Sequence, residues 1–578
     1  MSNIWKNAQI KITRTSGFDK SFHSLATPKV GTITPLLFDE IIPASKTKVD
    51  CALAVNLPPL AFDTFMRVSF DLEAVFVPTR LLVENYQYYF ADEVINYMGG
   101  SSGKVYMPCL NFLNSKEKAS GGGDVYNATQ QAEIERIHHQ LCDAGTLADY
   151  LGFRQEMLWF DCVWPSSTYE KTISALPFLA YHRAWSDLYR NQKIQRPAFA
   201  PLPSNNYPTQ TMGRRLAASP FITFDQNIYM IRQDTTITGN NNIFNLADGV
   251  SIFSLRQRNW DFDPYTTAYA TPNITSPSAI TVDTSGSSTN VTIPQIRIAN
   301  KSQEFRDRNA LVGPNFVDQL NLRYGANLSN SIAQRAICVG SASLPIYTSS
   351  VLQQAMDQAQ SVGTNNPFSS VGAKYGQAYS DARNFLCNFT AEEPGYLFIM
   401  GTLTPSACYA TGVARHFLRY IGDGSITDMA NGLLEQVGPE PIWSEEFMLT
   451  ASSALTPGIP TTPRGELFGY QDRYYSYKSR VDECHGLFRA GESLGSAVAQ
   501  RVLYAGQLTS QFLQIPTTAL DNVTAVTADM SNYGCMVDAY FRYYQTLPLH
   551  DFILPTITDP AYEHGKPVHF KRGGYEIR

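Results

Sequence analysis

The chain has 578 residues, and its 45 basic and 51 acidic side chains give a formal net charge of −6. Charged residues make up 17% of the sequence, against about 25% in an average soluble domain, whereas aromatic residues reach 12%. A hydrophobic content of 44% excludes a disordered chain, because such chains bury too little apolar area to offset their conformational entropy. A surface poor in charge and rich in tyrosine suggests that other molecules cover it.

The sequence carries no signal for membrane insertion or secretion. No stretch approaches the ~18 consecutive apolar residues of a membrane helix. The N-terminus contains Lys6, Lys11 and Arg14 without the apolar core of a signal peptide. The nine cysteines include no CxxC pair, which disfavours a disulfide framework or a metal cluster. We therefore expect a cytoplasmic product with reduced thiols and no cofactor, and a structural divalent cation is left open.

The clearest predicted element is a strand over Phe65–Pro78, where apolar and polar residues alternate. A period of two places the apolar set on one core face. Val30–Ile42 is predicted to be extended, with Pro35 interrupting its pairing. Weaker alternation predicts strands at Lys48–Leu57, Gly395–Thr404, Gly469–Lys478 and Cys535–Leu547. Because these strands lie far apart in the sequence, they favour an all-β sandwich with long connections.

Helices are predicted only in the connections between strands. The first has apolar residues close to a 3.6-residue repeat and stops at Gly99-Gly100. The predicted helices are Leu81–Tyr97, Asn127–Tyr150, Ser174–Asn191 and Val317–Tyr324. Helices confined to long excursions distinguish this chain from a doubly wound fold, in which strands and helices alternate at short range.

Two stretches are predicted to be surface loops. Gly99–Asp124 is rich in Gly, Ser and Asn, and Asp234–Pro294 is rich in Thr, Asn and Ser. Between Asp263 and Arg297 the only charged residue is Asp283. Because loops of this length are usually functional or disordered, we expect a contact with another subunit or a receptor, with plain disorder as the alternative.

A basic, aromatic-rich stretch extends over Lys171–Phe224, with seven basic residues against the single acid Asp187. Cations that pair with phosphates and rings that stack on bases together bind single-stranded nucleic acid. The alternative is a helix with a solvated cationic face followed by a proline-rich connector. The candidate DNA-binding residues are Arg183, Trp185, Arg190, Lys193, Arg196, Arg214 and Arg215, together with Lys6, Lys11, Arg14, Lys566, Lys571 and Arg572 near the two ends.

An acid-rich span, Tyr420–Pro463, has the opposite character. It contains six acids and no Lys or Arg: Asp423, Asp428, Glu435, Glu440, Glu445 and Glu446. A protein with oppositely charged regions can present one of them to a polyanion and the other to solvent. We therefore expect this span on the outside, with Glu445-Glu446 in a solvated turn.

The enzyme-like patterns are weak. Gly491–Gly495 has the G-x-S-x-G form of a nucleophile elbow around Ser493, and His550 with an upstream Asp (Asp521 or Asp529) could complete a triad. That motif needs a strand before it, a helix after it and a parallel sheet. A helix could follow over Ser496–Leu503, but the sequence does not predict the parallel sheet. His138-His139 and Cys142 lack the remaining ligands of a tetrahedral site. We predict no enzyme, and a serine esterase is the least favoured alternative.

Several short segments carry a family resemblance, and they keep their order along the chain. They are Ser16–Ser21, Asp63–Leu82 with its FVPTRLL end, Leu147–Gly152 (LADYLG), Leu176–Tyr181 with Trp185 and Tyr189–Gln192, Phe468–Tyr474 (FGYQDRY) and Gly486–Arg489 (GLFR). In these segments the chain resembles the major capsid proteins of microviruses, which are small single-stranded DNA phages, and is nearest to the gokushoviruses. The acid-rich span and the tail after Asp521 match no pattern of the family.

The resemblance implies an eight-stranded antiparallel viral jelly roll, a β-sandwich that spans residues 1–578 with long helix-containing and irregular insertions. The expected parts are a basic N-terminal arm (1–27), a helix-bearing insertion (79–225), a candidate threefold protrusion (234–294) and an extended basic C-terminal tail (548–578).

The resemblance also implies a structural function. The chain would self-assemble into a T=1-like icosahedral shell around a circular single-stranded DNA genome, in the bacterial host cytoplasm, and become part of the virion. Scaffolding and minor virion proteins and a host surface receptor are the further expected partners. The alternative is a jelly-roll phage protein that binds a receptor or a glycan as a small oligomer.

Overall fold

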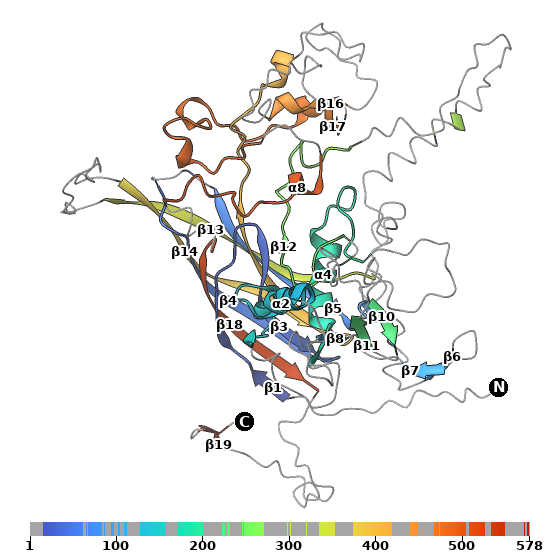
Figure 1. Ribbon diagram of the computed structural model, residues 1–578. Coiled ribbons are helices and arrows are strands. Elements are labelled where there is room, and N and C mark those ends of the chain that lie inside the picture. The colour runs from blue at the N-terminus through green and yellow to red at the C-terminus, as the bar shows by residue number, and fades with distance from the viewer. Residues whose placement is uncertain are drawn as a thin grey trace, which may run out of the picture.

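Figure 1 shows a computed structural model of the chain, and the description below concerns only part of it. The described residues are 16–61, 65, 67–83, 86, 94–96, 102–104, 109–112, 128–157, 171–199, 222–225, 228–231, 246, 248–270, 297–298, 301, 320, 334–352, 374–418, 440–448, 467–472, 474–503, 508–525, 533–548, 571–572 and 575–576.

Two antiparallel sheets form the centre of the molecule. Sheet A contains, in spatial order, β1 (Ser16–Asp19) and β2 (Phe22–Ala26), then β18 (Met536–Leu547), β4 (Lys46–Asn56) and β14 (Lys374–Thr390). Sheet B contains β13 (Ile337–Leu352), β5 (Val68–Pro78), β15 (Gly395–Pro405), β3 (Thr32–Ile41) and the two-residue β12 (Arg256–Gln257). In Figure 1 the red β18 lies beside the blue β4, so the sheets join distant parts of the sequence.

Strand β13 connects the two sheets. Its residues Ile337–Ile346 pair with β5, and its residues Tyr347–Leu352 pair with β14. The order of pairing therefore forms one continuous path of nine strands across the two sheets, and β2 pairs with β18 beside that path. Every pairing between these strands is antiparallel, as the separated strands of the sequence predict.

Apolar side chains from both sheets form the main core. Val49, Leu53 and Val55 of β4 point inward because they occupy alternate positions, and Phe70 and Leu72 of β5 do the same from sheet B. Every second residue of β18 from Val537 to Gln545 is likewise buried. Burial of a large apolar side chain contributes about 1.5–3 kcal/mol. A slip of one residue would turn these side chains to the other face of their sheet, so the alternating pattern specifies the register of the strands and the face on which the two sheets pack.

A helix-bearing segment covers the outer face of sheet B. Helices α2 (Ala128–Cys142), α3 (Leu147–Tyr150) and α4 (Leu176–Ala184) share a second core cluster with β5, β15 and β3. All eleven residues of β15 are consequently buried. Thr146 caps α3 by accepting a hydrogen bond from the Asp149 amide. Among the described helices, none is long and apolar enough to cross a membrane.

A third cluster lies where segments around β16 (Glu440–Trp443), β17 (Leu467–Gln471), α7 (Tyr475–Lys478) and α8 (Ser510–Leu513) meet. Phe447 is at its centre and contacts the rings of several neighbours, including Tyr265, whose centroid is 4.0 Å away.

The remaining elements are η1 (Thr79–Leu81), β6 (Val94–Asn96), β7 (Ser102–Lys104), β8 (Cys109–Phe112), β9 (Lys171–Ser174), η3 (Trp185–Tyr189), β10 (Ile222–Asp225), β11 (Ile228–Ile231), η7 (Arg415–Leu418), η9 (Ser444–Glu446), η10 (Gly486–Phe488), η11 (Gly495–Ala497), β19 (Lys571–Arg572) and β20 (Tyr575–Glu576).

The antiparallel sandwich with few helices agrees with the expected all-β fold. The predictions at Phe65–Pro78, Lys48–Leu57, Gly395–Thr404 and Cys535–Leu547 are confirmed as β5, β4, β15 and β18. Pro35 lies beside a register shift between β3 and β15, as its missing N–H predicts. Two predicted helices are confirmed: Asn127–Tyr150 is α2 and α3, and Ser174–Asn191 is α4 and the π-helical η3.

Other predictions are wrong or only partly right. Gly469–Lys478 is a strand only as far as Gln471, and the helix expected over Leu81–Tyr97 contains strand β6 near its end. Within the expected loop Gly99–Asp124, strand β8 is part of the second cluster, with Phe112 only 1% exposed. Of the helix predicted at Val317–Tyr324, all but residue 320 lies outside the described residues.

The excursion Asp234–Pro294 is partly internal. Ile252 and Phe253 belong to the second cluster, Trp260 to the main core and Tyr265 to the third cluster. Its described part is therefore a packed connector between all three clusters. Its residues 234–245, 247 and 271–294 lie outside the described residues. The protrusion stays a prediction.

Candidate nucleic-acid interface

In the described part of the basic stretch, strand β9 is followed by α4, which packs on sheet B. Pro177 stands in its first turn, where a missing N–H is tolerated. Phe178, Leu179 and Tyr181 are buried, and the Tyr181 hydroxyl donates a 2.7 Å hydrogen bond to the Ile33 carbonyl of β3. This contact fixes the helix, and the polar residues after it, against the sheet.

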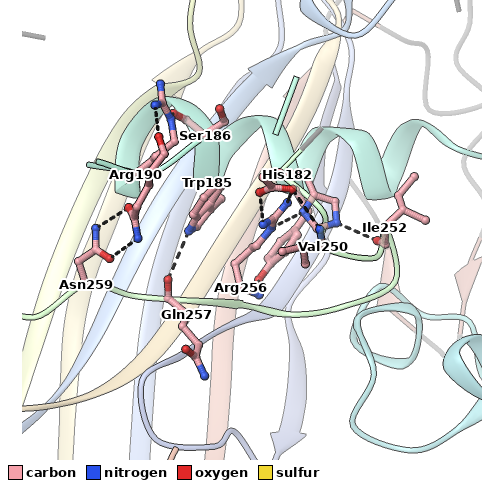
Figure 2. A network of polar contacts seen from close by, with 12 residues as sticks. His182, Trp185, Ser186, Arg190, Val250, Ile252, Arg256, Gln257 and Asn259 are labelled. Atoms are coloured by element: carbon pink, nitrogen blue, oxygen red, sulfur yellow. Dashed lines mark hydrogen bonds and ion pairs between the residues drawn. The ribbon is translucent and has the colours of Figure 1, made fainter. Parts of the chain in front are cut away.

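Trp185 opens the π-helical turn η3 and is buried, with 3% of its surface exposed. Figure 2 shows its indole Nε1 donating to the Gln257 carbonyl, at 3.3 Å. The Arg256 guanidinium lies over its ring, 4.3 Å from the centroid. In this arrangement Trp185 joins η3 to β12 and holds the stretch in place.

Arg256 and His182 form the centre of the polar network in Figure 2. Arg256 Nε donates to His182 Nδ1 at 2.8 Å, and its Nη1 pairs with Asp248 at 2.5 Å. Because a guanidinium only donates, Nδ1 must accept, and His182 Nε2 donates to the Ile252 carbonyl at 2.8 Å. Burial and, secondly, the Arg256 charge hold the pKa of His182 well below its usual value, so the imidazole is neutral.

The guanidinium groups of Arg183 and Arg190 are bound within the protein. Arg183 Nε pairs with Asp187 at 2.7 Å, and its Nη2 donates to the Gln334 carbonyl at 2.9 Å. Arg190 donates to the carbonyls of Ser186 and Gln195, at 3.2 and 2.9 Å. Burial lowers the pKa of Arg190 from its ordinary value. Both side chains thus stabilise the local backbone in this structure.

Lys193 and Arg196 are exposed to solvent. The Lys193 ammonium lies 4.9 Å from the centre of the Tyr269 ring, and its pKa is lowered by partial burial. The turn that carries both residues is fixed by a pair of amide hydrogen bonds between Gln195 and Asn259, at 2.9 and 3.0 Å. These two cations are the members of the described stretch best placed to meet a polyanion.

Most of the other candidates cannot be compared with this place. Lys6, Lys11, Arg14, Arg214, Arg215 and Lys566 lie outside the described residues. Lys571 and Arg572 form β19, which pairs with β20. Their part in DNA binding stays a prediction. His182, Asp248 and Arg256 are not among the predicted residues; the available signal is that Asp248 is the only charged residue between Asp234 and Arg256.

The described part of the acid-rich span, residues 440–448, differs from the solvated surface that its composition predicts. Glu440 and Glu446 are buried, and both pair with Arg415, at 2.9 and 2.7 Å. The Tyr475 hydroxyl donates to Glu446 at 2.8 Å. Burial raises the pKa of Glu446, and the Arg415 charge opposes that rise. The expectation of a solvated Glu445-Glu446 turn is therefore wrong for Glu446, because its carboxylate neutralises an internal arginine.

The enzyme-like patterns lack their structural context. Ser493 is exposed in a turn between the 3-10 turns η10 and η11, where a nucleophile elbow needs a strand and a helix. His550 lies outside the described residues. His139 Nδ1 lies 3.0 Å from Asp143 on the helix surface. Within the part of the chain that the structure describes, no three His, Cys, Asp or Glu side chains gather as metal ligands would.

Comparison with known proteins decides the family. The model of a phage family described as "Capsid protein (F protein)" matches residues 7–109 and 148–557. The chain belongs to this family. The match includes both sheets of the sandwich, the α3–α4 region and the third cluster, and it omits all of α2.

Curated relatives carry the same description. Capsid protein VP1 of Bdellovibrio phage phiMH2K is 20% identical over 572 residues, which cover 94% of this chain and 95% of the relative. Capsid protein VP1 of Chlamydia phage 1 is 24% identical over 282 residues, or 46% of this chain and 43% of the relative. Capsid protein VP1 of Spiroplasma virus 4 is 22% identical over 286 residues, or 48% of each.

The resemblance to microvirus capsid proteins is thereby confirmed. This capsid protein is a structural, non-enzymatic component of the virion, and membership of the family implies assembly into a shell.

Proposed function

We propose that this capsid protein builds a T=1-like icosahedral shell around circular single-stranded DNA, with an eight-stranded jelly roll as its structural unit. The strand order carries the proposal. If β1 and β2 count as one interrupted strand along β18, sheet A has four strands, and sheet B has four besides the short β12. Two facing four-stranded antiparallel sheets are the arrangement of a jelly roll.

The two predicted insertions fall in a single connection, between the end of β5 at Pro78 and the start of β13 at Ile337. Its helical part covers sheet B, and its segment 248–270 reaches the other clusters. The undescribed flanks of that segment remain the candidate protrusion. We expect them to contact neighbouring subunits or the host receptor.

Genome contact is supported by exposed cations and by the placement of the chain ends. Lys193 and Arg196 are exposed on a rigid turn. Ser16 pairs with Leu547, so the basic N-terminal arm and the C-terminal tail leave sheet A from adjacent strand ends. Exposed cations bind phosphates without regard to nucleotide sequence.

Electron microscopy tests the proposal. The full chain is produced together with the scaffolding and minor virion proteins encoded by its phage, and the product is separated by sedimentation. We expect closed shells of uniform size that contain DNA. A chain that remains a stable monomer at high concentration under those conditions would contradict the proposal.

A further inference from the structure

The outer faces of the two sheets differ in what covers them. The helix-bearing segment packs on sheet B, whereas the outward side chains along β2, β4, β14 and β18 of sheet A are exposed or half-buried. Some of them are large and apolar: Leu25 is 80% exposed, Phe385 is 57% exposed, and Tyr379, Met536 and Tyr544 are each close to half exposed. Soluble proteins rarely leave such groups together on one surface unless another molecule binds there.

The pairing register arranges these side chains as one continuous face. Residues opposite each other on neighbouring strands lie about 5 Å apart, so each set of paired residues forms a row across the sheet. From one end of the face to the other, the six rows across β14, β4 and β18 contain Tyr379 with Asn56 and Met536, Asp381 with Ala54 and Asp538, Arg383 with Ala52 and Tyr540, Phe385 with Asp50 and Arg542, Asn388 with Lys48 and Tyr544, and Thr390 with Lys46 and Thr546. Leu25 extends the second row beyond β18, and Asp19 extends the fifth.

The face has the composition and size of a protein–protein interface. Aromatic residues, methionine and arginine are enriched in such interfaces, and the rows contain all three kinds. With β1 and β2 counted as one strand, sheet A has four strands of about eleven residues, which cover about 700 Å² at a spacing of about 4.8 Å and a rise of about 3.4 Å per residue. Specific interfaces bury about 800 Å² on each partner, so one such face is large enough for a stable contact.

The charges on the face favour a second copy of this chain over DNA. With His23 neutral, the face carries four acids and four cations: Asp19, Asp50, Asp381 and Asp538, and Lys46, Lys48, Arg383 and Arg542. A polyanion gains affinity from an excess of cations, which this face does not provide. A surface with both signs of charge suits a partner that presents the same pattern in the opposite direction. As a capsid protein, the chain meets identical copies in its assembled state.

A twofold arrangement matches the charges of two copies. In an interface with twofold symmetry, the same surface of both subunits meets itself. If the axis runs across the strands between the third and fourth rows, β4 lies over β4, and the fifth row of one copy faces the second row of the other. Lys48 then lies over Ala54 of the second copy, between Asp381 and Asp538. The small side chain of Ala54 leaves room there for the lysine.

The same arrangement places the third row over the fourth, near the centre of the contact. Arg383 then faces Phe385 of the second copy, and Arg542 faces Tyr540. A guanidinium group is attracted to the face of an aromatic ring, and more strongly where water is excluded. Twofold symmetry repeats each of these contacts, so the centre and the charged rows favour the same alignment.

We propose that the outer face of sheet A packs against the same face of a second copy about a twofold axis, with Lys48 of each copy between Asp381 and Asp538 of the other. The inference rests on the proposed assembly, because such contacts would join the subunits of the shell in pairs.

Charge reversal with rescue tests the alignment. In the full chain, K48D or D381K/D538K is expected to lower the yield of closed shells about tenfold or more, because like charges then meet twice in every twofold contact. A variant with all three substitutions restores opposite charges and should recover most of the yield. Within one chain, Lys48 and these acids are about 20 Å apart along the strands, beyond the screening length of about 8 Å, so a recovery can arise only between copies.

The control is Lys48→Arg, which keeps the charge and should assemble like the unmodified chain. Each unassembled variant should retain the unmodified unfolding midpoint, which separates assembly from stability. Unmodified yields from the reversed variants would overturn the inference, and so would a loss that the triple variant does not recover. If the unmodified chain forms no shells at all, the proposed function fails instead.

Hydroxyl-radical oxidation of Leu25 and Met536 identifies what covers the face. Both side chains are expected to be oxidised readily in the unassembled chain and several-fold more slowly in the shell, whether or not the shell contains DNA. Equal rates in the unassembled chain and the shell would overturn the inference. Protection that appears only in shells filled with DNA would assign the face to the genome and would overturn it as well.

Discussion

His182 shows how a buried polar network fixes a protonation state. The imidazole accepts a hydrogen bond from Arg256 and donates one to Ile252, so both ring nitrogens are used in the neutral form. A second proton would remove the acceptor and place a cation beside the guanidinium, in a site without solvent. His182 is therefore a structural residue that joins α4 to the segment before β12.

The network predicts a loss of stability in mild acid. The pKa of His182 is lowered in the folded state from the ordinary 6.5, so the unfolded chain binds more protons below that pH. Stability is thus fully present above about pH 6.5 and falls at up to about 1.4 kcal/mol per pH unit below it. Urea unfolding of the unassembled chain near pH 7.5 and pH 5.5 measures this loss. A His182→Gln variant, whose amide also accepts and donates a hydrogen bond, should lose less stability between pH 7.5 and pH 5.5 than the unmodified chain. An equal loss of stability in both proteins would exclude His182 as the cause.

The individual cations could be located from the sequence, but their contacts could be predicted only in part. Arg183 and Asp187 are four residues apart, and a helix brings such positions together, so their ion pair is readable from spacing. The hydrogen bonds of Arg190 to carbonyls depend on how the turn after η3 folds back. The burial of Trp185 depends on Gln257, which is distant in sequence. Composition thus identified the stretch but not which cations face solvent.

At the scale of elements, a glycine fixes the entry into β3. Gly31 has a φ of +68°, and a Cβ placed there would lie 2.6 Å from Ile515 Cβ and 2.7 Å from the Ile515 carbonyl oxygen. Gly31 also accepts a hydrogen bond from the Arg258 amide, and Ile515 donates one to the Arg258 carbonyl. The glycine therefore allows three separate segments to meet at the edge of sheet B.

Alanine substitutions at Gly31 and at a control glycine separate the cost of the left-handed backbone from the cost of the contact with Ile515. Gly31→Ala is expected to cost about 3 kcal/mol or more, because the left-handed backbone costs about 1–3 kcal/mol and the contact with Ile515 adds to it. Gly249→Ala is the matched control, since Gly249 has a φ of +86° and no atom within 4 Å of the added Cβ. Chemical unfolding of both variants gives the two costs. Similar values would show that the Ile515 contact relaxes freely.

The strands found by alternation are those that bury one regular face. β4, β5 and β18 satisfy this condition, whereas the long strands β13 and β14 were not predicted. Gly340 and Pro345 interrupt the pattern of β13, and a register shift in β14 at Phe385–Cys387 breaks its alternation. The aromatic run after Gln471 does not continue β17, since Tyr474 takes a left-handed conformation, with a φ of +64°, and helix α7 follows it.

At the scale of the molecule, the low content of charged residues has two causes, which are burial within the chain and coverage by neighbouring subunits. The connection between β5 and β13 covers sheet B, so β15 is buried on both faces. The buried apolar residues form three hydrophobic clusters rather than one. A sandwich thickened in this way needs fewer charged residues even before neighbouring subunits cover it. The arrangement of the connection could not be predicted, because nothing in its composition says which sheet it packs against.

The last prediction concerns the genome and uses only cations that are free to reach it. Arg183 and Arg190 are unsuitable probes, because their guanidinium groups hold the protein's own backbone. Lys193→Glu with Arg196→Glu is expected to lower the DNA content of purified particles and to reduce the slope of binding against salt by about 0.7 for each lost phosphate contact. Lys193→Arg with Arg196→Lys keeps the charges and is the control. If reversal leaves both DNA content and salt slope unchanged, the genome is held from elsewhere, and the basic chain ends beside β1 and β18 become the next positions to test.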